Sequence, residues 1–346
     1  MFTYAPAILP ASPALVVVLH GCTQSAASYD LGAGWSTLAE RHGFVLLLPE
    51  QVAANNPKTC FNWFLPGDSE RDRGEALSIR QMIEKTIGAY DIDRKRVFIT
   101  GLSAGGAMAA AMLATYPEVF AAGAIIAGLP YGTAANVQEA FESMFRGRSL
   151  TAREWGDLVR DASRHRGPWP RVSIWHGDAD ATVVPMNSEA LVRQWTDVHG
   201  IETAPKRDVV DGYPHRSWRR DGIDVVESFT ITGMAHGTPL ATGASGCGRA
   251  GAFLLDVGIS SSSHVAKFFG LTGTTHMHAG QPAGDTPIGS LWPVMENVEI
   301  IPDERVEILN RTAGKPQSEE DPDGRIDLMA VITKALTSAG LMKPPR

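Results

Sequence analysis

The chain has 346 residues, of which 44% are hydrophobic and 20% are charged, and its formal net charge is −7 at pH 7. This length and composition are ordinary for a globular enzyme built as one large α/β domain or two smaller ones. The acidic balance argues against nucleic acid as the natural partner, and no apolar run approaches the roughly 20 residues that a membrane-spanning helix needs.

Short apolar runs alternate with helical patterns along most of the chain. We expect strands at residues 14–20, 44–48, 97–100, 120–129, 171–175 and 225–232, with the last of these completing the sheet. We expect helices at residues 35–42, 75–90, 187–199 and 264–269, and one directly after residue 103 whose inner face carries Met108, Met112 and Leu113. Strands that are apolar on both faces are typical of a sheet covered by helices on both sides. The pattern predicts an α/β fold with a mostly parallel central sheet.

Three segments interrupt this alternation. The long loop 50–72 contains several aromatic residues, which favour an ordered and functional loop. Residues 130–170 contain two expected helices, at 137–145 and 152–163, which we interpret as a small cap over the carboxyl ends of the strands. The catalytic domain is therefore expected to span 1–271. Residues 272–346 form an extension with an acidic stretch at 318–323 and one terminal amphipathic helix. We expect this helix to pack on the main domain, and its packing against a second copy in a homodimer is the alternative.

The segment Gly101-Leu102-Ser103-Ala104-Gly105 has the form G-x-S-x-G. Between an apolar strand and a helix, this motif is typical of a nucleophile elbow, in which a sharp turn exposes the serine hydroxyl. The two glycines allow backbone segments to approach without a Cβ clash. The alternative is a glycine-rich turn without chemistry. The context favours Ser103 as a nucleophile.

Two aspartates follow the strand at 171–175. A nucleophilic serine needs a base, and the base needs a third group to orient it. Asp178 lies close to the glycine of the turn and is expected to accept backbone N–H bonds there. Asp180 lies farther out, so we expect it to be the orienting acid. The alternative is that both are turn-forming residues.

The histidine that follows the strand at 225–232 is His236, flanked by small residues. We predict that it is the base. His215, expected in a polar loop, and His264, expected at the start of a late helix, are the rivals. His276 and His278 could ligate a metal, but two ligands without a third make no site. We therefore expect neither a metal nor a cofactor.

An acyl-transfer site also needs donors for the developing oxyanion. We expect the backbone N–H of Ala104, after the nucleophile, and that of Cys22, in the loop after the first strand, with the N–H of Thr23 as the second choice. His20 is expected to be a buried structural residue that bonds to the backbone and holds this loop. Thr23, Phe61 and Trp63 are the candidates for a substrate pocket, although for the two aromatic residues loop packing is the interpretation that we favour.

The chain has three cysteines, Cys22, Cys60 and Cys247, which are too few for a disulfide scaffold and contain no C-x-x-C pair. Residues 1–13 lack the basic region of a secretory signal, so we expect a cytoplasmic protein. A secreted protein whose signal had been removed would have the same sequence features.

Several motifs together resemble the poly(3-hydroxybutyrate) depolymerase family of esterases, which is related to feruloyl and acetylxylan esterases. The similarity runs from about residue 15 to residue 271. The motifs that carry it are His20-Gly21-Cys22-Thr23-Gln24, Pro49-Glu50-Gln51, Cys60-Phe61-Asn62-Trp63-Phe64, Gly101-Leu102-Ser103-Ala104-Gly105-Gly106-Ala107-Met108 and Gly177-Asp178-Ala179-Asp180.

The resemblance implies an α/β-hydrolase fold and a serine carboxylesterase with Ser103 as nucleophile, Asp180 as acid and His236 as base. It also implies that Cys22 and Cys60 can form a disulfide between the oxyanion loop and the aromatic loop. The expected substrates are short-chain esters or 3-hydroxybutyrate oligomers, since no linker or polymer-binding domain of the secreted depolymerases is visible. A feruloyl or acetylxylan esterase, a peptidase or acyltransferase, and a non-catalytic binding protein are the alternatives.

Overall fold

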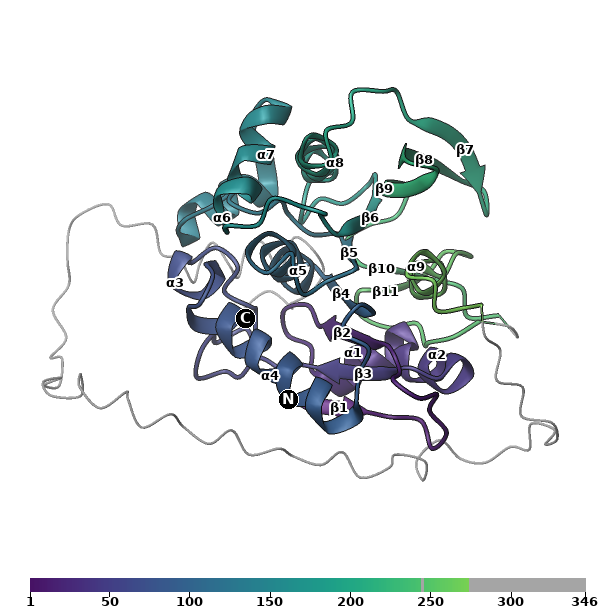
Figure 1. Cartoon of the computed structure of the whole chain (residues 1–346). Coiled ribbons are helices and arrows are strands. Elements are labelled where there is room, and N and C mark those ends of the chain that lie inside the picture. The colour runs from purple at the N-terminus through teal and green to yellow at the C-terminus, as the bar shows by residue number, and fades with distance from the viewer. Residues whose placement is uncertain (244–245, 274–346) are drawn as a thin grey trace, which may run out of the picture. The chain divides into compact units, whose positions relative to one another are not determined.

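A computed structural model describes residues 1–243 and 246–273 (Figure 1). The expected terminal helix, the acidic stretch, and the pair His276 and His278 lie outside these residues. No helix within the described ranges is both long enough and apolar enough to cross a membrane.

The described residues form a nine-stranded sheet with the strand order β1-β3-β2-β4-β5-β6-β9-β8-β7. The six strands β3, β2, β4, β5, β6 and β9 are parallel, as the sequence predicts, and antiparallel strands flank them at both edges. The strands are β1 (Phe2–Tyr4), β2 (Leu15–Leu19), β3 (Val45–Leu48), β4 (Val97–Leu102), β5 (Ala122–Ile126), β6 (Arg171–Gly177), β7 (Lys206–Val210), β8 (Tyr213–Arg220) and β9 (Ile223–Ile231), followed by the separate pair β10 (Thr238–Leu240) and β11 (Leu254–Asp256).

Helices cover both faces of the sheet (Figure 1). They are α1 (Ala26–Ala33), α2 (Trp35–His42), α3 (Pro66–Ser69), α4 (Gly74–Tyr90), α5 (Ala104–Thr115), α6 (Val137–Arg146), α7 (Ala152–Asp161), α8 (Met186–Val198) and α9 (Ser261–Phe268). Side chains of β2 alternate between two apolar clusters, because successive residues of a strand point to opposite faces. Leu15 and Val17 pack in the cluster with α4, α5 and α8, whereas Val16 packs in the cluster with α1, α2 and α9.

Helix α5 is buried on every side, which corrects the expectation that Met108, Met112 and Leu113 mark a single inner face. All twelve of its residues are buried. The helix consists largely of alanine and glycine, so neighbouring backbones approach it closely all round. An N-terminus held this firmly is a rigid support for the residue before it, which is Ser103.

The edge of the sheet differs from the prediction. Residues 206–210 and 213–220 form the antiparallel hairpin β7–β8, so His215 lies in a strand and not in a polar loop. Strand β9 is also not the last strand, because β10 and β11 follow it. The hairpin is rich in arginine, lysine and histidine. An exposed edge strand can carry such residues, and the resulting polar sequence does not look like a strand.

Both helices expected in the 130–170 insertion are present. Trp155 and Val159 of α7 are fully buried, and the Trp155 carbonyl accepts a hydrogen bond from Gln194 Nε2 of α8 at 3.1 Å. In α6, the Met144 carbonyl accepts a hydrogen bond from the N–H of Val184 in the loop after β6. The insertion is thus attached both to the helical layer and to the loop that carries Asp180.

Candidate active site

Ser103 lies in a turn between β4 and α5 with φ 57° and ψ −116°. A non-glycine residue rarely adopts a positive φ, and such strain concentrates at functional sites. A Cβ added at Gly105 would lie 2.5 Å from the His20 carbonyl oxygen, and one added at Gly101 would lie 2.3 Å from the Gly105 carbonyl oxygen. Both glycines are therefore required by close backbone contacts on either side of the serine.

A continuous chain of hydrogen bonds joins three side chains from separate loops. His236 Nε2 lies 2.9 Å from Ser103 Oγ, and His236 Nδ1 lies 2.7 Å from Asp180 Oδ2. With the ring proton on Nδ1 donated to the carboxylate, Nε2 is an acceptor for the serine hydroxyl. The arrangement can remove a proton from Ser103 and hold the resulting positive charge.

The carboxylate of Asp180 is enclosed by donors. Its Oδ1 accepts the N–H groups of Thr182 and Val183 at 2.8 and 2.9 Å, and its Oδ2 also lies 3.4 Å from His176 Nε2. Burial alone would raise the pKa of Asp180, but the interactions of its carboxylate with His176 and His236 outweigh it and hold the pKa well below its ordinary value. Asp180 is therefore ionised at neutral pH.

Asp178 and the rival histidines have other partners. Asp178 is exposed and accepts the Gly233 N–H at 2.6 Å, as expected for a turn-forming acid. His215 Nδ1 lies 2.7 Å from Asp208, and its Nε2 lies 3.2 Å from Glu227. His264 Nε2 lies 2.8 Å from Asp211. The structure brings only His236 of these histidines to Ser103.

The loop after β2 is held in place by His20. Its Nδ1 lies 2.8 Å from the Gly21 carbonyl oxygen, and its Nε2 accepts the Gln51 N–H at 3.1 Å. The Nδ1 atom therefore donates, and the ring is neutral. Burial lowers the pKa of His20, which preserves this form. The structural role expected for His20 is confirmed.

The two candidate amides in this loop are in different situations. The Thr23 N–H donates to the Lys58 carbonyl at 2.8 Å, so it is already used. Within the described ranges, the Cys22 N–H has no backbone acceptor. Ala104 is the first residue of α5, where an N–H has no acceptor within its own helix. The geometry favours Cys22 over Thr23 as the second donor.

A disulfide joins Cys22 to Cys60, with the two Cα atoms 4.2 Å apart. Together with the bond from Thr23 to Lys58, it attaches the loop after β2 to the aromatic loop. Cys247 is a free, buried cysteine.

Glu75, at the start of α4, is a half-buried acid that sequence reasoning missed. It accepts hydrogen bonds from Asn62 N and Asn62 Nδ2, both at 2.8 Å, and from Gln51 Nε2. Burial raises the pKa of Glu75 to about 7, and the hydrogen bonds from Asn62 and Gln51 oppose this rise. The Pro49-Glu50-Gln51 and Cys60-Phe61-Asn62 motifs were the available signal, since Gln51 and Asn62 both donate to this carboxylate.

Phe61 and Trp63 are buried core residues, 3% and 9% exposed. The ring of Phe61 lies 5.0 Å from the ring of His20, and that of Trp63 lies 5.4 Å from that of Phe64. These contacts support the alternative of loop packing. Thr23, in contrast, is exposed beside the candidate oxyanion donors.

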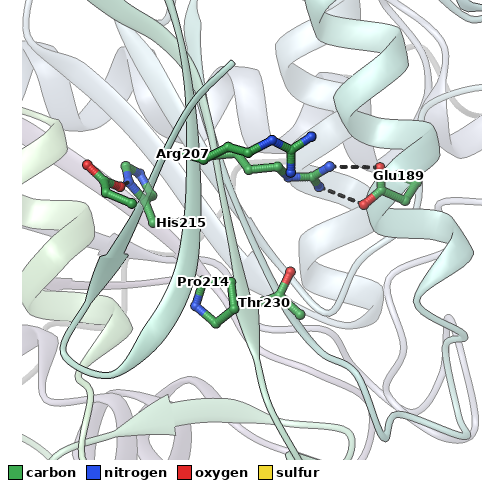
Figure 2. Close-up of a pocket in the computed structure, with 7 residues that line it drawn as sticks. Glu189, Arg207, Pro214, His215 and Thr230 are labelled. Atoms are coloured by element: carbon green, nitrogen blue, oxygen red, sulfur yellow. Dashed lines mark hydrogen bonds and ion pairs between the residues drawn. The ribbon is translucent and has the colours of Figure 1, made fainter. Parts of the chain in front are cut away.

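A pocket of about 340 Å³ lies away from Ser103, on the edge hairpin β7–β8 (Figure 2). Its lining residues are Glu189, Arg207, Asp208, Pro214, His215, Arg216 and Thr230. Arg216 is paired with Glu189 through two contacts of 3.1 and 2.6 Å. No group of three or more metal-ligating side chains occurs in the part of the chain that the structure describes.

Comparisons with known proteins agree with this architecture. The chain is 49% identical over 278 residues to poly(3-hydroxyalkanoate) depolymerase C of Paucimonas lemoignei, covering 79% of this chain and 67% of that protein. It is 34% identical over 250 residues to feruloyl esterase B of Neurospora crassa, covering 69% and 83% respectively. The solved structure of an acetyl xylan esterase from Aspergillus awamori matches with a TM-score of 0.64 and 25% identity, over 78% of this chain and 93% of that one.

The fold is therefore the α/β-hydrolase fold. Residues 3–209 match the family described as esterase PHB depolymerase. The chain belongs to this family and is a carboxylic ester hydrolase.

Proposed function

We propose that the protein is a serine carboxylesterase that hydrolyses short-chain or hydroxyalkanoate esters through Ser103, His236 and Asp180. The observation that carries the proposal is the hydrogen-bond chain from Ser103 Oγ through His236 to Asp180, with distances of 2.9 and 2.7 Å. The strained backbone of Ser103 and the rigid start of α5 support it.

In the proposed acylation step, His236 Nε2 takes the proton of Ser103 Oγ while the oxygen attacks the ester carbonyl carbon. The N–H groups of Cys22 and Ala104 bind the oxyanion that forms. The carbon–oxygen bond to the alcohol then breaks, and His236 donates its proton to the leaving alkoxide. The product is an acyl-enzyme on Ser103.

In the proposed deacylation step, His236 takes a proton from water, and the hydroxide attacks the acyl carbon. The bond to Ser103 Oγ breaks, and His236 returns the proton to the serine. Asp180 remains ionised throughout and holds the imidazole in the required tautomer.

Replacement of the nucleophile tests the proposal. Ser103→Ala is expected to abolish hydrolysis of p-nitrophenyl butyrate and labelling by a fluorophosphonate, while the circular dichroism spectrum and melting temperature stay close to those of the wild type. Ester hydrolysis that survives this change would exclude Ser103 as the nucleophile.

A second candidate is an esterase of the feruloyl or acetylxylan type, favoured by the 34% identity to feruloyl esterase B and by the acetyl xylan esterase structure. A panel of acetyl, butyryl, hydroxybutyrate-oligomer and feruloyl esters separates the two. The highest kcat/KM on a hydroxybutyrate oligomer or a butyryl ester supports the first candidate, and the highest value on acetyl or feruloyl esters supports the second.

The disulfide Cys22–Cys60 helps to distinguish a secreted protein from a cytoplasmic one. Disulfides persist in oxidising environments and are rare in the cytoplasm, so among the two alternatives we favour a secreted protein. The protein is isolated from its source, denatured without a reducing agent and titrated for thiols. One free thiol per chain is expected. Three free thiols would favour the cytoplasm.

A further inference from the structure

The short turn 251–253, just before β11, contains a non-glycine residue with a positive φ, which is Phe253. The N–H of Gly251 donates to the Leu254 carbonyl at 2.9 Å, and the N–H of Leu254 donates back to Gly251 at 3.1 Å, so the turn is tightly closed. Within it, Phe253 has a φ of 61°. An aromatic residue rarely adopts this region, and such outliers persist where the surroundings enforce them, often at functional sites.

The turn contacts the candidate active site at two points. Gln24 Nε2, in the loop that carries the candidate oxyanion donor, donates to the Ala252 carbonyl at 3.5 Å. The ring of Phe253 lies 6.0 Å from the ring of His236, at an interplanar angle of 78°. The Phe253 carbonyl also accepts the Thr238 N–H at 2.8 Å. The turn therefore connects the two loops that flank Ser103.

The contact between Gln24 and the Ala252 carbonyl links the turn to the loop that carries Cys22. Gln24 Oε1 accepts the Gly21 N–H at 2.9 Å, next to the candidate donor Cys22. The side chain thus orients the oxyanion loop with one end and contacts the turn with the other. The backbone of the turn is thus linked to the oxyanion loop, and the ring of Phe253 lies beside His236.

The proposed mechanism determines on which side of Ser103 each part of the ester lies. In the proposed mechanism, the carbonyl oxygen points toward the amides of Cys22 and Ala104. The alcohol oxygen must lie within hydrogen-bond distance of His236 Nε2, because that atom supplies its proton. The alcohol part of the ester therefore passes alongside His236, where the half-buried ring of Phe253 lies.

We propose that Phe253 is a specificity residue that forms the wall of the site on the alcohol side and favours esters with an apolar alcohol part of several carbons. This inference rests on the proposed function. The next hydroxyacyl unit of a hydroxyalkanoate oligomer is such an alcohol, with its alkyl side chain available for contact with the ring.

The test compares two esters that share an acyl group. Phe253→Gly removes the ring, and glycine adopts a φ of 61° without strain, so the fold is expected to remain intact. For hexyl butyrate, kcat/KM is expected to fall about ten-fold, the size of effect that a lost apolar pocket contact produces. For methyl butyrate, it is expected to stay within about two-fold of the wild type. Phe253→Leu retains apolar volume and should recover most of the activity on hexyl butyrate.

The two chemical steps separate this role from a simple bracing of His236. The alcohol has left before deacylation, so an alcohol-side residue affects acylation only. In stopped-flow measurements with p-nitrophenyl butyrate, the deacylation rate of Phe253→Gly is expected to equal that of the wild type. Equal losses on both esters with slower deacylation would show that Phe253 braces His236 and would overturn the proposal. Unchanged kinetics on both esters would overturn it as well.

A matched control is Phe268→Ala in α9, which removes another half-buried ring of the same apolar cluster, stacked on Arg171. It should leave the ratio of kcat/KM values for the two esters unchanged. Ser103→Ala tests the underlying mechanism separately, because it should remove all activity whatever the alcohol.

Discussion

Asp180 Oδ2 lies 2.7 Å from His236 Nδ1, although 56 residues separate the two along the chain. Strands β6 and β9 are neighbours in the sheet, and their pairing places Gly177 opposite Ile231. The loops that follow these strands therefore begin side by side, at the same edge of the sheet. The geometry of the acid and the base is a consequence of the parallel register.

Asp180→Asn is expected to reduce kcat for p-nitrophenyl butyrate by a factor on the order of 10³ to 10⁴, because an amide stabilises the wrong tautomer of His236 and cannot balance its charge. Asp178→Asn is the matched control, since the Asp178 side chain accepts the N–H of Gly233 in the turn and makes no hydrogen bond to Ser103, His236 or Asp180 among the described residues. It should change kcat by no more than a few fold. A larger loss for Asp178→Asn than for Asp180→Asn would reverse the assignment.

The disulfide is expected to contribute to stability. Cys22 and Cys60 are 38 residues apart, and closing a loop of this size reduces the entropy of the unfolded chain by an amount worth about 4 kcal/mol. Cys60→Ser should lower the free energy of unfolding, measured in urea, by roughly this amount. It should also lower kcat, because the loop that carries Cys22 loses its covalent attachment to the loop 50–72.

Cys247→Ser controls for the disulfide experiment, since Cys247 is buried but unbridged. After treatment with a reducing agent, Cys247→Ser should lose stability as the wild type does, whereas Cys60→Ser should show no further loss. An effect of reduction on Cys60→Ser would assign the stabilisation to something other than this bond.

Stability should depend on pH through His215. Burial alone would lower the pKa of His215, but hydrogen bonds with Glu227 and Asp208 outweigh it and raise the pKa above 6.5. Protonated His215 therefore stabilises the edge hairpin fully below about pH 6.5, and the stabilisation is lost as the pH rises through the higher folded-state pKa. Urea unfolding of the wild type and His215→Gln should show a large difference at pH 5.5 and a small one at pH 9. A difference that grows with pH would contradict this linkage.

The network around Glu75 is expected to be intolerant of an amide. All the groups that face the carboxylate are donors, from Asn62 and Gln51, so the NH₂ group of a glutamine would face another donor. Glu75→Gln should lower the free energy of unfolding by about 1 kcal/mol, the lower end of the cost of leaving a polar group unsatisfied, because Glu75 is half-buried. Glu84→Gln, on the exposed side of the same helix, loses surface ion pairs with Arg80 and Arg94 and should cost less than about 1 kcal/mol.

The local sequence was sufficient to predict the central strands. Residues such as Leu15 to Leu19 are apolar without interruption, which is what a strand buried on both faces requires. It was also sufficient to single out Ser103, Asp180 and His236, because each follows a recognisable strand end in a known order. The hairpin β7–β8 was missed because its exposed edge position imposes no apolar pattern.

What the sequence determined by itself was the alternation of strands and helices, the glycines around Ser103 and the order of the three site residues. Only the tertiary structure decided which side chains meet, because contacts depend on strand order and register and not on spacing along the chain. It placed Asp180, which the sequence already favoured, against His236, and it left the N–H of Cys22 without the backbone acceptor that the N–H of Thr23 has. It buried Phe61 against His20, brought Glu75 into hydrogen-bond contact with Asn62 and placed the ring of Phe253 beside His236.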